Sequence, residues 1–92
     1  NTETAYNDLK EGKVKVLFVG LIFIDDLKKI NKCCRKFGFE YTFTNDVVVK
    51  EEYLEEAVIE YNKVMIEYLD LLNETDWKKK LKESCKINLI KN

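Results

Sequence analysis

Histidine and proline are both missing from this chain of 92 residues, and glycine occurs only three times. Without histidine, the chain lacks the commonest general base, the commonest metal ligand and the base of the usual serine or cysteine triad. It also contains no phosphate-binding loop and no Gly-x-Gly-x-x-Gly motif. We therefore expect no enzymatic activity, no metal site and no cofactor.

Long apolar runs are missing as well. The longest, residues 16–24, is far shorter than the roughly 20 residues that a membrane helix needs. No linker-like segment and no internal repeat interrupts the chain. These absences predict one soluble domain over residues 1–92, with no membrane partner.

Cysteine is scarce: the three residues are Cys33, Cys34 and Cys85. Three cysteines cannot all pair within one chain, and no two of them have the Cys-x-x-Cys spacing. We expect reduced cysteines that act as small apolar side chains in a cytoplasmic protein. A disulfide from Cys33 or Cys34 to Cys85 is the alternative.

The hydrophobic pattern predicts helices and strands in a definite order. In sequence, they are a short helix (4–11), a strand (13–24), a helix (25–37), two strands (39–44 and 47–49), a long helix (51–73), a short helix after Thr75 and a strand (86–91). After the first helix, this is the order of the ferredoxin-like, or split βαβ, fold (βαββαβ). We predict an α+β protein of this kind, with a short extra N-terminal helix and a long, acidic second main helix.

Residues 24–31, Ile-Asp-Asp-Leu-Lys-Lys-Ile-Asn, resemble the strand-to-helix junction of diguanylate cyclase (GGDEF) domains. The resemblance implies a ferredoxin-like core and aligns Asn31 with the family's nucleotide-contacting asparagine. Phe23 stands where the family has a metal-binding aspartate, and the turn at residues 45–46 lacks the family's Gly-Gly signature. The resemblance thus implies a catalytically inactive palm that senses a nucleotide near Asp25 and Asn31, not a cyclase.

Charges are sorted along the chain, although the net charge is only −1. Residues 27–39 carry five positive charges and no negative one, and residues 77–92 carry six lysines against Glu83 alone. Between them, residues 51–76 carry nine carboxylates against Lys63 alone. The molecule is strongly dipolar unless folding places the acidic helix beside the basic ones.

The acidic helix predicts binding to a basic protein, for example a nucleic-acid-binding protein, in a regulatory or inhibitory role. Apolar residues on several sides of this helix, and on both faces of the first strand, predict that a protein partner or a second copy, as in a homodimer, covers them. The predicted partner-binding residues are Glu51, Glu52, Glu55, Glu56, Ile59, Glu60, Ile66, Glu67 and Asp70.

A nucleic-acid-binding module is the alternative function. Its lysine-rich helices would contact phosphates through Lys28, Lys29, Lys32, Arg35, Lys36, Lys78, Lys79 and Lys80. The acidic isoelectric point argues against it. So does the predicted third strand, Val47-Val48-Val49, which has no aromatic ring for base stacking.

Overall fold

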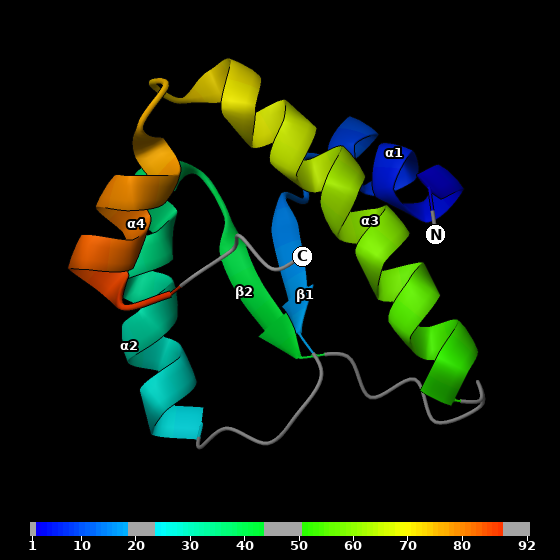
Figure 1. The fold of residues 1–92 in the computed structure, drawn as a ribbon, viewed down its shortest axis with the longest axis horizontal. Coiled ribbons are helices and arrows are strands. Elements are labelled where there is room, and N and C mark those ends of the chain that lie inside the picture. Colours follow the sequence, from blue (N-terminus) through cyan, green and yellow to red (C-terminus); the bar gives the residue numbers. More distant parts are fainter. Residues whose placement is uncertain (1, 19–23, 44–50, 88–92) are drawn as a thin grey trace.

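The computed structural model describes residues 2–18, 24–43 and 51–87, and gives the backbone alone for residues 51–55. This part of the chain forms four α-helices around a two-stranded sheet (Figure 1). In chain order, the elements are α1 (Thr2–Lys10), β1 (Lys15–Phe18), α2 (Ile24–Cys34), the 3-10 helix η1 (Arg35–Phe37), β2 (Glu40–Phe43), α3 (Glu51–Leu72) and α4 (Trp77–Cys85).

Two glycines mark helix ends as predicted. Gly12 follows α1 with φ +75°, and Gly38 follows η1 with φ +92°. This left-handed conformation favours glycine because it has no Cβ. At Gly38 a Cβ would also lie 2.7 Å from a methyl carbon of Leu72, so the end of that side chain would have to shift, and the backbone angle is the stronger reason for glycine.

The predicted ends of two strands need correction. Ile24, predicted as the last residue of the first strand, is the first residue of α2. Lys86 and Ile87, predicted to open the last strand, lie outside any strand, and Lys86 caps α4 with φ +60°. The predicted strand at 47–49 and the rest of the last strand lie outside the described residues.

The two described strands pair directly and in parallel, with Val16 opposite Tyr41. In a split βαβ fold, a third strand lies between the first two. The α+β class is therefore confirmed, whereas the ferredoxin-like arrangement is not.

An asparagine from a flanking helix closes each outer edge of the sheet. On the β1 side, the Asn62 amide of α3 accepts a hydrogen bond from the Leu17 N–H (2.8 Å) and donates one to the Leu17 carbonyl (2.9 Å). On the β2 side, the Asn31 amide of α2 accepts from the Tyr41 N–H (2.6 Å) and donates to the Tyr41 carbonyl (3.0 Å). Each asparagine thus satisfies backbone groups that an edge strand otherwise leaves unpaired.

Helices cover the sheet from two sides: α2 and α4 lie side by side on one, and α1 and α3 on the other (Figure 1). Successive β1 side chains point to opposite sides, so Val16 and Leu17 join different apolar clusters. The cluster around Val16 contains Cys34, Phe39, Leu69, Trp77, Leu81, Cys85 and Ile87. Leu17 packs against the cluster of Ala5, Tyr61, Val64 and Met65.

Packing within the chain changes two expectations. Leu17 lies on a strand face that we expected another molecule to cover, yet α1 and α3 of the same chain cover it. On α3 the predicted apolar stripe included Tyr68 and Leu72 and omitted Leu69. In the structure Leu69 is fully buried, while Tyr68 and Leu72 are 37% and 55% exposed. The stripe shifts because α3 contributes side chains to both clusters.

The two edge asparagines provide the first test. Asn31→Ala and Asn62→Ala each leave a backbone N–H and carbonyl without their partner, so we expect each to lower the free energy of unfolding by about 1–3 kcal/mol. Asn7→Ala, at an exposed position of α1, is the control and should change it by less than about 0.5 kcal/mol. Urea unfolding followed by circular dichroism measures all three. If all three variants changed the free energy of unfolding equally and by less than about 0.5 kcal/mol, the hydrogen bonds at the sheet edges would contribute little to stability.

Candidate interaction surfaces

The structure shows the surroundings of several residues that the sequence suggested for metal or nucleotide binding. The described segments contain no group of three or more His, Cys, Asp or Glu side chains that could hold a metal ion. Asn31, which the cyclase resemblance aligns with a nucleotide-contacting residue, is buried and uses its amide to hold Tyr41. Asp25 and Asp26 are exposed in the first turn of α2. Phe23 lies outside the described part of the chain.

Across residues 2–18, 24–43 and 51–87, no helix combines the length and the apolar character needed to cross a membrane.

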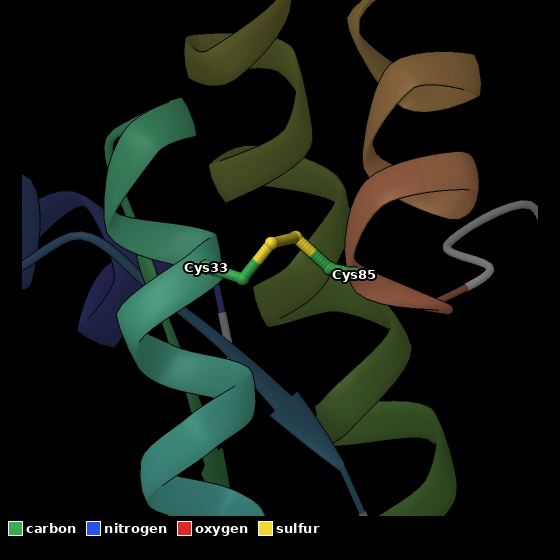
Figure 2. The surroundings of a disulfide bond; sticks show 2 residues. All are labelled: Cys33 and Cys85. Atoms are coloured by element: carbon green, nitrogen blue, oxygen red, sulfur yellow. A yellow bond between two sulfur atoms is a disulfide. The ribbon is translucent and has the colours of Figure 1, made fainter.

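A disulfide links Cys33 of α2 to Cys85, the last residue of α4 (Figure 2). Their Cα atoms are 5.7 Å apart, and 52 positions separate them in the sequence. The expectation of three reduced cysteines is therefore wrong, and the alternative pairing is present. Neighbouring residues of a helix point in different directions, so Cys33 reaches α4 while Cys34 is fully buried in the core as a free thiol.

Two buried titratable groups have structural roles. Burial raises the pKa of the Cys34 thiol from 9.0 to about 11, which keeps it protonated and unreactive at neutral pH. Burial, together with a 2.6 Å hydrogen bond donated to Asp8, raises the pKa of the Tyr61 hydroxyl. The Asp8 carboxylate also lies 3.7 Å from the Lys15 ammonium, so this polar group ties α1, β1 and α3 together.

The exposed side of α3 carries an acidic ridge, defined here as Glu56, Glu60 and Glu67. Their spacing of four and seven residues places them on one face of the helix, and all three are exposed. None forms an ion pair with another residue of the described segments. Lys63 lies on the same face, and Ile59 at its edge is 60% exposed.

The other predicted partner-binding residues have different surroundings. Ile66 is partly buried against the core. Asp70 accepts a 2.8 Å hydrogen bond from the indole N–H of Trp77 and lies 3.7 Å from the Lys78 ammonium, so it helps to fix α4. Residues 51, 52 and 55 belong to α3, but their side chains lie outside the described part.

A shallow hollow of about 310 Å³ lies between α1 and α3, beside the acidic ridge. Its walls combine an aromatic ring, an apolar side chain, two carboxylates and one ammonium group. The residues are Thr2, Tyr6, Glu60, Lys63, Val64 and Glu67. Tyr6 was not predicted as a site residue, because the short N-terminal helix showed no connection to the acidic one in the sequence.

The lysine-rich helices α2 and α4 lie together, which the disulfide enforces (Figure 2). Of the predicted phosphate-binding residues, Arg35 pairs with Glu40, Lys78 with Asp70, and Lys80 with Glu74 and Asp76. Seven exposed lysines of this region form no ion pair with a described residue. We call this set the basic face; it consists of Lys28, Lys29, Lys32, Lys36, Lys79, Lys82 and Lys86.

Lys82 and Lys86 were missed as site residues. Lys82 lies three positions before Cys85 and Lys86 one position after it. A predicted bridge from Cys33 to Cys85 would have placed both lysines near the basic residues of the other helix.

No family model, no curated protein and no solved structure matches this chain.

The cysteine arrangement gives a second test. With one buried free thiol and one disulfide, the folded protein should react with Ellman's reagent at pH 8 at less than one hundredth of the rate of free cysteine. A pKa of about 11 in place of 9.0 alone lowers the thiolate fraction about 100-fold. In guanidinium chloride, one thiol per chain should react fully. Three reactive thiols in the unfolded protein would contradict the disulfide.

Proposed function

We propose that this chain is a non-enzymatic interaction protein that binds a basic protein partner through the acidic ridge of α3, in a regulatory or inhibitory role. The observation that carries the proposal is the hollow beside the ridge, which Glu60 and Glu67 line together with Tyr6. An acidic surface alone attracts many cations, whereas a hollow that combines carboxylates with an aromatic ring suits a cationic side chain with a flat or apolar part.

The side chain that fits best is an arginine of the partner. Its apolar stem can lie along Val64, and its planar guanidinium can stack on the Tyr6 ring and bind a carboxylate of the ridge. Tyr6 is 51% exposed in the isolated chain, so its ring is accessible. Lys63 opposes an incoming cation, but the two carboxylates outnumber it.

The packing of the helices supports the proposal. If α3 lay beside the basic helices, their charges would neutralise the ridge. Instead α3 packs on α1 and β1, and α2 packs on α4. Contacts between α3 and lysines of α4 are confined to its C-terminal end and the following loop, where Asp70 and Glu74 pair with Lys78 and Lys80.

The compartment is part of the proposal. The cytoplasmic location expected from the sequence rested on reduced cysteines. Disulfides persist in oxidising environments and are rare in the cytosol. The Cys33–Cys85 bridge therefore supports a location in an oxidising compartment.

An octa-arginine peptide is the probe for the ridge. In titrations followed by NMR chemical shifts, we expect the largest changes at Tyr6 and at residues 60–67. Glu60→Gln combined with Glu67→Gln should weaken binding about three- to tenfold, because each removes one attractive charge at the surface. Asp25→Asn combined with Glu83→Gln makes the same change in net charge on α2 and α4, away from the hollow.

Equal weakening by the two double variants would show that only net charge matters, and would contradict the ridge as the binding surface. Tyr6→Ala tests the hollow itself. Its control is Tyr68→Ala, which removes another partly exposed ring of the same helix pair.

Self-association is a second candidate, favoured by apolar exposure at the C-terminal end of α3. Leu71 is 89% exposed and Leu72 55%, and Tyr68 lies beside them. Sedimentation velocity should show a dimer at about 50 µM, as expected for a modest interface. Leu71→Ser should shift it to monomer, whereas Ile59→Ser, on another side of α3, should not. A wild-type monomer at this concentration would exclude the dimer.

A further inference from the structure

Four lysines of the basic face surround the disulfide. Lys29 and Lys36 lie about one helical turn before and after Cys33, and Lys82 lies about one turn before Cys85, with Lys86 directly after it. Because the bridge brings the two helices together at this point, exposed lysines of both helices are held within about one helical turn of the same covalent link.

Stability does not account for this grouping. Like charges on neighbouring helices repel one another, and none of the seven lysines forms an ion pair within the described segments. Asp25 and Asp26 lie about one turn before Lys28 and Lys29 on α2 but form no ion pair with them, and Glu83 is a single carboxylate among the α4 lysines. A region of unpaired positive charge held by a covalent bond suits the binding of a polyanion.

The side chains present indicate how the polyanion is recognised. The face uses lysines, which bind anions as point charges, and its only neighbouring arginine is paired with Glu40. The aromatic residues of this region, Phe37 and Trp77, pack against each other and against the core rather than presenting a ring for base stacking. Recognition by charge alone fits a linear polyanion that is bound through its anionic groups and not through the stacking of flat rings.

We propose that the basic face binds a sulfated polysaccharide of the heparin class. Basic patches bind both nucleic acids and heparin-like chains, and the Cys33–Cys85 disulfide favours the second because it is typical of oxidising compartments. The ligand's sulfates would pair with Lys29 and Lys32 of α2, Lys36 of η1, Lys82 of α4 and Lys86 at the end of α4. This proposal does not rest on the acidic ridge.

Heparin affinity chromatography in a sodium chloride gradient tests it. The folded, disulfide-bonded protein should remain bound at about 0.15 M salt, where interactions between exposed charges more than about 8 Å apart are largely screened. Lys29→Glu combined with Lys82→Glu should elute at clearly lower salt and bind a heparin oligosaccharide about tenfold more weakly or worse. Lys10→Glu combined with Lys63→Glu, the same charge change on α1 and α3, should stay close to wild type.

Three outcomes would overturn the proposal. The first is failure of the wild type to be retained even at low salt, and the second is equal loss of retention by the two double variants. The third is a DNA duplex of matched charge that binds as tightly as the heparin oligosaccharide in fluorescence anisotropy. If the glutamate variant does not fold, as judged by circular dichroism, Lys29→Gln with Lys82→Gln replaces it. Glu60→Gln with Glu67→Gln should not lower heparin retention, which separates this face from the acidic ridge.

Discussion

The fold depends on two asparagine side chains that take the place of strands. Parallel strands of four residues each do not form a stable layer by themselves. Asn62 and Asn31 satisfy the outward backbone groups of Leu17 and Tyr41, and each anchors its own helix to one edge of the sheet. Because these edges are opposite, α3 and α2 are held apart by the width of the sheet.

This separation of α2 and α3 determines where the charges lie. The acidic helix is fixed beside β1 with α1 as its neighbour, and the basic helix is fixed beside β2 with α4 as its neighbour. Among the described residues, ion pairs between the acidic and basic segments lie where the chain passes from α3 into α4. There, Asp70, Glu74 and Asp76 pair with Lys78 and Lys80. The rest of each surface keeps its own sign.

The sequence alone predicted most of the local structure. Periodicity located the four helices of the described segments and the strand at 40–43. Periodicity was insufficient for the first strand, because a run that is apolar on every side does not show where a strand ends. It also failed for the α3 stripe, since the sequence does not show that α3 spans two clusters.

Long-range relations were beyond the sequence for a different reason. Asparagine is usual in turns and helix caps, and nothing near Asn62 indicates a partner 45 residues away. Similarly, runs of charge predicted a dipolar molecule or a balanced one, and only the packing decided between them. Helix spacing predicts that Glu56, Glu60 and Glu67 share one exposed face. The structural role of Asp70, in contrast, depends on where Trp77 packs.

The magnitudes show why the basic helices can remain together. A disulfide that closes a loop of about 50 residues stabilises a fold by about 4 kcal/mol in the chain-entropy view. Burial of Leu81 and Trp77 adds about 1.5–3 kcal/mol for each side chain. Surface charge pairs contribute about 0–1 kcal/mol each, and repulsion between exposed lysines is screened to a similar size. Packing and the covalent bond thus outweigh the repulsion, so the lysines around Cys33 and Cys85 are not required to balance one another and remain available to an anion from solution.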